Sequence, residues 1–436
     1  MAHILLATIG SLGDLHPFIA IGRALREQGQ RVTLAVPEDG VAKARAAGLD
    51  AAPILPSYAS VCARLRLSES EVAARILADT GFVLDEILMP ALHESSVALD
   101  RLADSADVVA ASVFAFAAEI VAEKRSLPLA GIVLQPMTLF SALQPPRAPR
   151  FELMCHRPRS MLGEGWNRLG YATIRRLLRT RYGSRIDAVR ASHGLGSRTG
   201  APMLDHSPAT AALLCCWSAP LGSLPPDAPA GAVLTGFPFF DSESGSADAA
   251  IDPALADFLA EGDAPLVFSL GSFAVAAAGR FYERAAAVAR QLNRRAVLLT
   301  GQPGAATREG DCLSVGYAPH SMVFPHAAAI VHHGGAGSSG QALRAGRPQL
   351  IVPHFGDQYD NAARLVDAGV ARRMNRAAFT AKRAAPIIAE LLESAAIAQC
   401  ARSAAEAIAQ EGDGAANAAR AIIGLANGEK STHPIE

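Results

Sequence analysis

The sequence predicts an α/β protein of two Rossmann-like domains that face one another across a cleft. Each half of the chain opens with a short apolar strand, a turn of glycine and serine, and an amphipathic helix, near 3–29 and 264–292. A stretch rich in Pro and Gly, and then in small polar residues, separates the halves near 219–253. Because strand–helix–strand crossovers build doubly wound parallel sheets, this repetition indicates two such sheets.

Composition places the chain among globular enzymes. About half of the 436 residues are apolar and the formal net charge is −1, so charge provides no argument for a nucleic-acid partner. The N-terminus lacks a basic segment, and no apolar run approaches the ~20 residues of a membrane span, so we expect a cytoplasmic protein. No C-x-x-C pair occurs, and we expect reduced thiols without a metal site at Cys62, Cys155, Cys215, Cys216, Cys312 and Cys400.

The first half alternates predicted strands and helices. An apolar strand at 3–7, an amphipathic helix at 18–29 and a strand at 31–37 form a strand–helix–strand opening. Helical spacing then runs through 57–104, a position from which a segment can cover a cleft. Further strands are predicted at 107–113, 128–136, 211–218 and 232–237 in this half, and at 264–272 and 296–301 in the next.

The segment 144–200 is strongly basic. It carries twelve arginines against three acids, interleaved with Pro, Trp and Tyr, and part of it has helical periodicity. One interpretation is a solvated pair of helices over the cleft. The other is a surface that meets anionic lipid or an acidic ligand, which places the protein peripherally on the inner face of the membrane. Both interpretations stay open at this point.

The most informative stretch runs from 317 to 358. At its centre, an apolar run ends in glycines and serines and then resumes as a helix-compatible segment, which predicts strand, turn and helix N-terminus. Free backbone N–H groups and the helix dipole favour an anion at such a turn. Glycines at 334, 335 and 337 let the backbone approach a phosphate, and Ser338 and Ser339 can donate hydrogen bonds to it.

The residues on either side of this turn extend the site. Tyr317 precedes the turn, and an acid and an amide, Asp357 and Gln358, follow another apolar strand. Ligands of open α/β sheets bind at the carboxyl ends of the strands. An aromatic ring, a phosphate turn and an Asp-Gln pair in this order match a base, a diphosphate and a sugar, so the sequence predicts a nucleotide-sugar site.

With these motifs in place, the stretch resembles the donor box of the family 1, GT-B nucleotide-sugar glycosyltransferases, the UDP-glycosyltransferase superfamily. The bacterial type includes macrolide, glycopeptide and rhamnolipid enzymes with HHGGAGS-like and DQxxNA-like signatures. The resemblance implies that Tyr317 stacks on the nucleobase with His320 beside it, and that Asp357 and Gln358 hold the sugar hydroxyls. It implies further donor contacts at Gly13, Gly271, Ser272, His333, Gly335, Gly337, Ser338 and Gln341.

Gln341 stands where the family carries a ribose-binding Glu. A carboxylate that grips two ribose hydroxyls suits UDP, whereas its loss is tolerable with a deoxyribose donor such as dTDP. The sequence therefore favours dTDP slightly and leaves UDP open. Two donor–acceptor pairs fit: dTDP-rhamnose with a hydroxyacyl lipid, and UDP-glucose with a terpenoid or phenolic acceptor.

The family's catalytic base lies in the loop after the first strand. The resemblance places Asp14 where plant enzymes carry histidine and glycopeptide-type enzymes carry aspartate. The plant partner acid is replaced by Ser112, which agrees with a lone aspartate base. His16 is the alternative base or an acceptor contact, and an N-cap role for Asp14 before a helix at Phe18 is the alternative without catalysis.

These observations predict an inverting, metal-independent hexosyltransferase that acts on a hydroxyl of a lipophilic small molecule. No D-x-D motif occurs, so no metal cofactor is expected. The alternatives are a sugar-nucleotide epimerase or hydrolase of the same fold, or a non-catalytic subunit that binds the donor. The expected domains are an acceptor-binding domain at 1–220, a linker at 221–240, a donor-binding domain at 241–410, and a helix at 411–436 that crosses back to the first domain.

Overall fold

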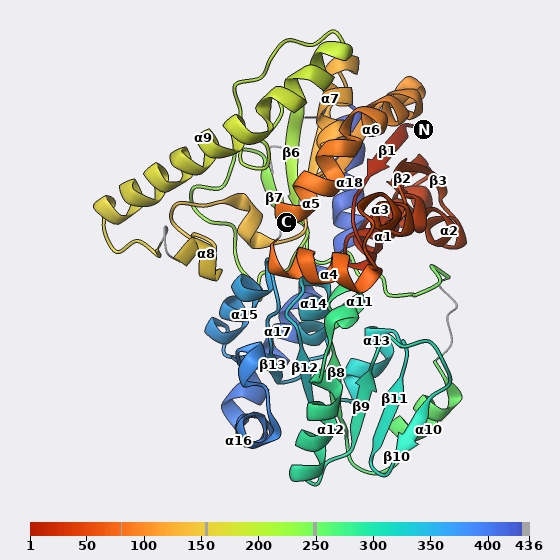
Figure 1. The fold of residues 1–436 in the computed structure, drawn as a ribbon, viewed down its shortest axis with the longest axis vertical. Helices are drawn as coiled ribbons and strands as arrows, with labels where there is room; N and C mark the ends of the chain where they lie inside the picture. The colour runs from red at the N-terminus through yellow and green to blue at the C-terminus, as the bar shows by residue number, and fades with distance from the viewer. Residues whose placement is uncertain (80, 153–155, 247–250, 430–436) are drawn as a thin grey trace.

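The computed structural model describes residues 1–79, 81–152, 156–246 and 251–429, and it forms two α/β domains (Figure 1). Each domain holds a seven-stranded sheet. In spatial order the first sheet is β3 (Asp50–Leu55), β2 (Arg31–Pro37), β1 (His3–Ala7), β4 (Val108–Ser112), β5 (Leu129–Val133), β6 (Thr210–Cys215) and β7 (Ala232–Leu234). The second is β10 (Thr307–Glu309), β11 (Cys312–Val315), β9 (Ala296–Leu299), β8 (Leu266–Ser269), β12 (Ala329–His332), β13 (Gln349–Ile351) and β14 (Ala371–Arg373).

Helices cover both sheets. Those of the first domain are α1 (Leu12–Glu27), α2 (Glu38–Ala46), α3 (Tyr58–Leu65), α4 (Glu69–Ala78), α5 (Gly81–Val83), η1 (Leu84–Leu88), α6 (Met89–Leu102), η2 (Ala103–Ser105), α7 (Phe116–Arg125), η3 (Pro136–Leu139), α8 (Pro149–Glu152) and α9 (Met161–Ser192). After the first sheet follow α10 (Pro253–Ala260), α11 (Gly271–Ala274), η4 (Val275–Ala277), α12 (Phe281–Gln291), α13 (His320–Val323), η5 (Phe324–His326), α14 (Ala336–Arg344), α15 (Gln358–Asp367), η6 (Arg376–Ala378), α16 (Ala381–Glu393), α17 (Ala395–Glu411) and α18 (Gly414–Ala426).

The strand order creates two switch points. All ladders are parallel except β10 with β11. The order reverses beside β1 and β4 in the first sheet, and beside β8 and β12 in the second. β1, β4, β8 and β12 are fully buried apolar runs, as expected for parallel strands covered on both faces. The loops after these strands therefore define where a ligand binds.

The first helix begins earlier than predicted. Helix α1 starts at Leu12, not Phe18, and encloses Pro17. Proline cannot donate a hydrogen bond to the carbonyl four residues earlier, which here is the carbonyl of Gly13. Because Gly13 is exposed, this carbonyl is left to water. Asp14 consequently lies in the first turn of the helix, while Ser11 occupies the N-cap position without a side-chain capping bond. The N-cap interpretation of Asp14 is therefore wrong.

Two segments near the domain boundary differ from a simple linker. Strand β7 lies inside the expected linker 221–240 and pairs with β6, so the first sheet extends into this segment. The strand predicted at 232–237 is thus confirmed over its first three residues. Helix α18 packs in the core of the first domain, beside Ile21 and Leu25 of α1. Residues 430–436 of the predicted tail lie outside the described residues.

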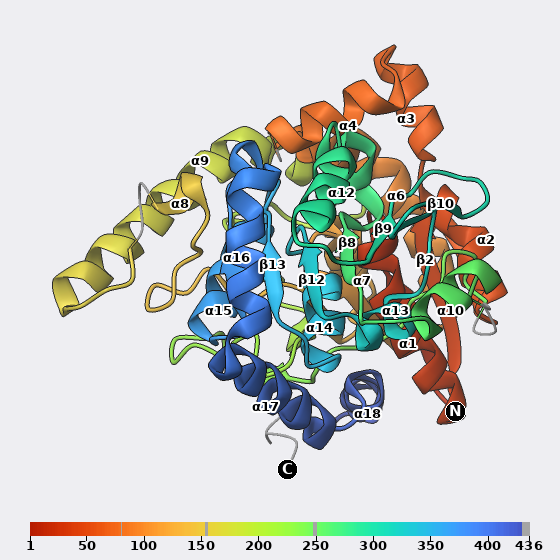
Figure 2. The ribbon, with the colours of Figure 1, turned by 90° about the horizontal axis from the view of Figure 1, so that it is seen from below.

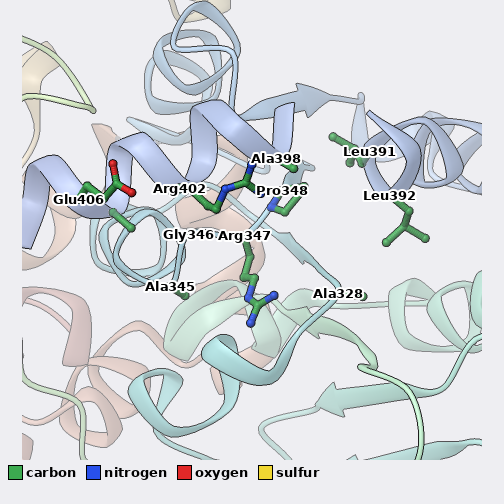
Figure 3. Close-up of a pocket in the computed structure, with 11 residues that line it drawn as sticks. Ala328, Ala345, Gly346, Arg347, Pro348, Leu391, Leu392, Ala398, Arg402 and Glu406 are labelled. Atoms are coloured by element: carbon green, nitrogen blue, oxygen red, sulfur yellow. The ribbon is translucent and has the colours of Figure 1, made fainter. Parts of the chain in front are cut away.

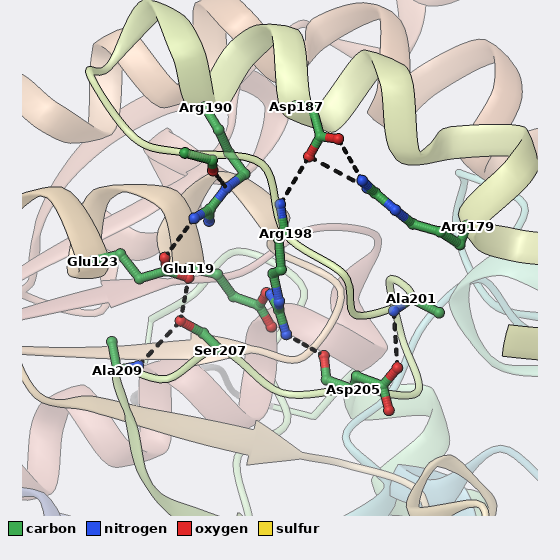
Figure 4. Close-up of polar contacts among 11 residues, drawn as sticks. Glu119, Glu123, Arg179, Asp187, Arg190, Arg198, Ala201, Asp205, Ser207 and Ala209 are labelled. Carbon is green, nitrogen blue, oxygen red and sulfur yellow. Dashed lines mark hydrogen bonds and ion pairs between the residues drawn. The ribbon is translucent and has the colours of Figure 1, made fainter. Parts of the chain in front are cut away.

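The basic segment forms one long helix and not a helix pair. Helix α9 spans 32 residues, and its C-terminal end is anchored to the domain by buried ion pairs (Figure 4). Arg190 donates to Glu123 at 2.8 Å, and Arg198 donates to Glu119 at 2.6 Å. Glu123 also accepts from the Ser207 hydroxyl at 2.7 Å. These ion pairs neutralise part of the positive charge of the basic segment.

Length and composition decide whether a helix can cross a membrane. In the part of the chain that the structure covers, no single helix is long and apolar enough to cross a membrane. One pair, Ala381–Glu393 with Ala395–Ala426, passes this test jointly across a 70° bend. The same helices contribute buried residues to the domain cores.

The buried ion pair of Arg190 and Glu123 leads to a testable prediction about the stability of the fold. Glu123→Ala leaves the Arg190 guanidinium buried without its partner, and we expect the free energy of unfolding to fall by about 3 kcal/mol. The exposed pair of Arg280 and Glu283 is the control, and Glu283→Ala is expected to cost less than about 1 kcal/mol. Urea denaturation followed by tryptophan fluorescence measures both; equal losses would contradict the prediction.

Candidate active site

The glycine turn after β12 is supported on its buried side by the His332 side chain. This imidazole is fully buried; its Nε2 lies 2.9 Å from Gln349 Oε1, and its Nδ1 accepts from the Gly334 N–H at 3.1 Å. Burial lowers the pKa of His332 to about 4, so the ring is neutral at pH 7. His332 is therefore a packed residue at the end of the strand that shapes the turn from inside.

His333 lies on the other side of the turn, between two glycines. A Cβ at Gly271 would lie 2.5 Å from His333 Cε1, and one at Gly335 would lie 2.5 Å from Nε2. Burial and the neighbouring histidines lower the pKa of His333 well below its usual value. Nδ1 is buried and makes no hydrogen bond of acceptable geometry with the described residues, although the Ser269 backbone is near. The ring is neutral, and because Nδ1 is buried, Nε2 is the nitrogen left to meet a ligand oxygen.

The N-terminus of α14 follows directly. Gly335 is the N-cap residue and provides no side chain to cap the helix, while the Ala336 N–H lies beside the Asp357 carboxyl. Gly337 is exposed with open space around it, Ser338 is 8% exposed, and Ser339 is fully buried. This arrangement of free N–H groups, hydroxyls and helix dipole can bind a phosphate.

The turn after β8 brings the two domains into contact. Gly271 has a φ of 69°, a conformation that favours glycine, and Ser272 follows it. The Ser272 hydroxyl lies 3.4 Å from the Ser11 hydroxyl of the first domain. The two Gly-Ser turns predicted for the two halves thus meet across the cleft.

Asp357 is tied to the glycine turn by Asn361. The Asn361 amide nitrogen, fully buried, donates to Asp357 Oδ2 at 2.8 Å and to the Gly334 carbonyl at 2.9 Å. Burial raises the pKa of Asp357 to about 7, against the opposing hydrogen bond from Asn361. The sequence motif contained Asn361, but we did not predict its role; the four-residue spacing on one helix is the signal that pairs it with Asp357.

Gln358 is placed differently from its expected role. Its side chain is 2% exposed, and Oε1 accepts from the backbone N–H groups of His354 at 2.8 Å and Phe355 at 3.2 Å. The oxygen therefore shapes its own loop, and only the amide nitrogen remains for a ligand.

Asp14 lies on the opposite wall. Burial, with the negative charge of Asp357, raises the pKa of the Asp14 carboxyl to about 7, against a smaller opposing effect of the Ser11 backbone. Gly10, with a φ of 91°, makes room for this carboxylate, because a Cβ there would lie 2.2 Å from Asp14 Oδ2. The negative charge of Asp357, in the second domain, thus acts on the Asp14 carboxyl of the first. The role of Gly10 is another that sequence reasoning missed.

His16 points elsewhere. Its Nε2 lies 2.9 Å from the Ser242 carbonyl, and its ring packs edge-on against Phe240 at 5.5 Å between centroids. Burial lowers the pKa of His16, with the Ser242 carbonyl and Asp241 opposing. His16 therefore contacts the segment that joins the domains, whereas Gly13 is exposed in the first turn of α1.

The predicted nucleobase contacts lie beside the same segment. Tyr317 is half-buried, and burial with the nearby acids Asp241 and Glu243 raises its pKa. His320 stacks on Phe324 at 4.2 Å and lies 3.1 Å from the Ser269 hydroxyl. Burial lowers the pKa of His320 to about 3, so this ring is neutral too.

Gln341 is engaged by a residue that sequence reasoning did not single out. Arg344 donates to Gln341 Oε1 at 2.7 Å, and its guanidinium lies 4.1 Å from the centre of the Phe239 ring. One of the two acceptor positions of the Gln341 oxygen is therefore already used. No sequence signal identifies this contact beyond the three-residue spacing on α14.

A cavity of about 470 Å³ lies elsewhere in the second domain (Figure 3). Ala328 and Pro348, which immediately precede β12 and β13, help to line it, together with Arg402 and Glu406 of α17. It therefore lies at the amino ends of the strands, opposite the edge where ligands of such sheets bind. We do not assign it to the site.

No group of three or more His, Cys, Asp or Glu side chains able to hold a metal ion occurs among the described residues. The cysteines in the described ranges are free thiols: Cys62, Cys215, Cys216 and Cys312 are buried and Cys400 is exposed. Cys155 lies outside the described residues.

The glycine turn makes a second prediction. Gly335→Ala places a Cβ against the His333 ring, and we expect a loss of about 1–3 kcal/mol in the free energy of unfolding. Gly337→Ala, two residues on, meets open space inside a helix and is expected to be neutral or stabilising by up to about 1 kcal/mol. Thermal denaturation of the two variants measures the difference, and equal effects would refute it.

Two protein families match the chain. The N-terminal domain of glycosyltransferase family 28 matches residues 4–141, and the C-terminal domain of the erythromycin biosynthesis protein CIII-like family matches residues 302–419. The O-mycaminosyltylonolide 6-deoxyallosyltransferase of Streptomyces fradiae is 30% identical over 429 residues, 94% of each chain. The vancomycin aglycone glucosyltransferase of Amycolatopsis orientalis is 28% identical over 98% of this chain and 99% of its own.

Solved glycosyltransferases share the fold. The glycotransferase of kitacinnamycin has a TM-score of 0.67 at 21% identity, over 97% of this chain and 98% of its own. The calicheamicin glycosyltransferase CalG4 has a TM-score of 0.68 at 17% identity, over 98% of both. Glycosyltransferase VinC, solved with dTDP, has a TM-score of 0.67 at 18% identity, over 98% and 99%. With the relative from Streptomyces fradiae matching nearly the whole chain, the protein belongs to the family 1 glycosyltransferases of the GT-B fold, of the bacterial macrolide and glycopeptide type.

Proposed function

We propose that the protein transfers a hexose, with inversion, from a nucleotide sugar to a hydroxyl of a lipophilic small molecule. The observation that carries this proposal is a pair of carboxyls from opposite domains, Asp14 and Asp357. The charge of Asp357 acts on Asp14, and Asp357 is tied to the glycine turn through Asn361. Burial raises the pKa of each to about 7. Sugar transfer needs a base to take the acceptor proton, and a carboxyl in the cleft with a raised pKa can take this role.

Asp14 is the proposed base. As the acceptor oxygen forms its bond to the anomeric carbon, the bond from that carbon to the diphosphate breaks and the acceptor proton passes to Asp14. Attack from the side opposite the leaving group inverts the anomeric centre. A base whose pKa lies near the working pH is both available and strong enough to accept this proton.

In this proposal, oriented hydrogen-bond donors and the helix dipole stabilise the leaving diphosphate. The N–H groups at the start of α14, the Ser338 hydroxyl and the neutral His333 imidazole surround the place where negative charge develops. The sequence carries no D-x-D motif. We therefore propose that the reaction proceeds without a metal ion.

The donor nucleotide is proposed to be dTDP. Gln341 replaces the family's glutamate, and its oxygen already accepts from Arg344, so this position offers two ribose hydroxyls fewer acceptor positions than a free carboxylate does. VinC, a structural neighbour, was solved with dTDP. UDP-glucose remains the second donor, since one relative is named a glucosyltransferase of the vancomycin aglycone.

The proposed acceptor is a lipophilic molecule with a free hydroxyl. Relatives are named for a tylonolide, for the vancomycin aglycone and for sterols. In the present chain α4 of the first domain lies against α11 and η4 of the second, which agrees with the expectation that 57–104 covers the cleft. Neither the sugar nor the acceptor is assigned further.

The role of Asp14 is tested by Asp14→Asn. We expect kcat to fall by about 10²–10⁴ while donor binding is retained, because the base is lost and the donor contacts are not. His16→Ala is the matched control and should retain most of kcat. In the unchanged protein kcat should rise with pH through about 7, because the carboxylate is the basic form. A reversed pattern between the two variants would assign the base to His16.

The donor is tested by thermal stabilisation with UDP, dTDP and GDP at equal concentrations. A ligand that binds only the folded protein raises Tm, and a hundredfold excess over Kd stabilises by about 2.7 kcal/mol. We expect the largest shift with dTDP. Gln341→Glu is expected to move the preference towards UDP. A shift with none of the three would refute the proposed donor site.

A further inference from the structure

One face of α9 is apolar and exposed. Seven large hydrophobic side chains are prominently exposed in the part of the chain that is described, and five of them lie on this helix. They are 60–88% exposed: Met161 88%, Leu162 87%, Trp166 60%, Leu169 62% and Leu177 63%. Four of them, from Leu162 to Leu177, fall on one side of the helix at spacings of 4, 7 and 15 residues from the first. We call this the α9 stripe.

The opposite side of α9 is packed against the first domain, which fixes how the helix is turned. Tyr171 and Tyr182 are buried, and the Tyr171 hydroxyl donates to the Ser141 carbonyl at 3.0 Å. The buried Asn167 amide donates to the Ala142 carbonyl at 2.8 Å. The helix cannot rotate its apolar side inward without breaking these contacts. The α9 stripe is therefore a stable feature of the surface.

The stripe also lies on a projecting part of the molecule. The N-terminal half of α9 extends away from the body in both views (Figures 1 and 2). The C-terminal half is anchored by the pair of Arg190 and Glu123 and by Arg181, which donates to Asp85 at 2.5 Å. The C-terminal half of α9 is thus fixed to the domain, and its N-terminal half projects. This arrangement allows the stripe to reach a flat surface ahead of the rest of the protein.

Positive charge borders the stripe. Between 156 and 181 the chain has seven arginines and one acid, Glu164, although the whole protein has a net charge of −1. Several of these arginines are paired with acids of the domain, including Arg175 with Asp205. Arg159 and Arg176 are exposed and have no ion-pair partner among the described residues. Exposed arginines without an ion pair in the described part of the chain thus flank the stripe at both Arg159 and Arg176, and Arg185 further along α9 is a third.

We propose that the α9 stripe docks the enzyme on an anionic lipid surface. Leucine and tryptophan side chains insert at the level of the headgroups, and flanking arginines are attracted to anionic lipids. A second copy of the same stripe is a poorer occupant, because the arginines of the two copies would repel each other. This proposal rests on surface residues outside the cleft and is independent of the donor and acceptor proposed above.

The test is co-sedimentation of the full protein with vesicles of phosphatidylglycerol and phosphatidylcholine, or of phosphatidylcholine alone. Binding is expected only to the anionic vesicles and should weaken at high salt. Leu162→Ser/Leu169→Ser/Leu177→Ser should abolish it. Arg159→Gln/Arg176→Gln should weaken it by about 25-fold, at roughly fivefold for each arginine.

Matched controls separate docking from folding and from general charge. Arg373→Gln/Arg383→Gln removes two exposed arginines of the second domain and should bind vesicles like the unchanged protein. Unchanged Tm and nucleotide-induced stabilisation would show that the triple serine variant is folded. Equal vesicle binding by this variant and the unchanged protein would overturn the proposal, as would the absence of any binding. A dimer that the serine substitutions dissociate would assign the stripe to self-association.

Discussion

The parallel arrangement of both sheets is the constraint on which the rest of the cleft depends. In each sheet the carboxyl ends of the parallel strands, all but β10, lie on one edge, and the strand order reverses there beside β1 and β8. The Gly-Ser turns after these two strands approach closely enough for Ser11 and Ser272 to contact one another at 3.4 Å. Helix α18 packs beside α1 in the first domain after the chain has completed the second. The chain thus connects the two domains a second time. This second connection helps to hold the two sheet edges in place opposite one another.

The electrostatics of the cleft follow from burial more than from formal charge. His320, His332 and His333 have lowered pKa values and are neutral at pH 7, whereas Asp14 and Asp357 have raised ones. Such a site presents hydrogen-bond donors and helix N–H groups in place of fixed cations. Oriented dipoles of this kind stabilise developing charge without reorganising during the reaction.

The arginines of the basic segment 144–200 have two different roles, and packing decides which role each of them takes. Arg190 and Arg198 pair with buried acids and hold the helix base, where an unpaired charge would be costly. Arg159 and Arg176 stay exposed beside apolar side chains at the projecting end. An excess of arginine in the sequence is compatible with either role, so the two were separated only by the contacts of each side chain.

The local pattern of the sequence by itself determined the strand–turn–helix units, the glycine turn at 334–337 and the acid after β13, because these depend on neighbours close in the chain. The boundary of α1 was missed since Pro17 is tolerated where the Gly13 carbonyl reaches water. Only the tertiary structure decided that the charge of Asp357 acts on Asp14, that His16 turns to Ser242, and that the oxygens of Gln341 and Gln358 accept from protein groups. Side-chain direction and contacts between domains depend on packing among residues distant in sequence, which no spacing rule encodes.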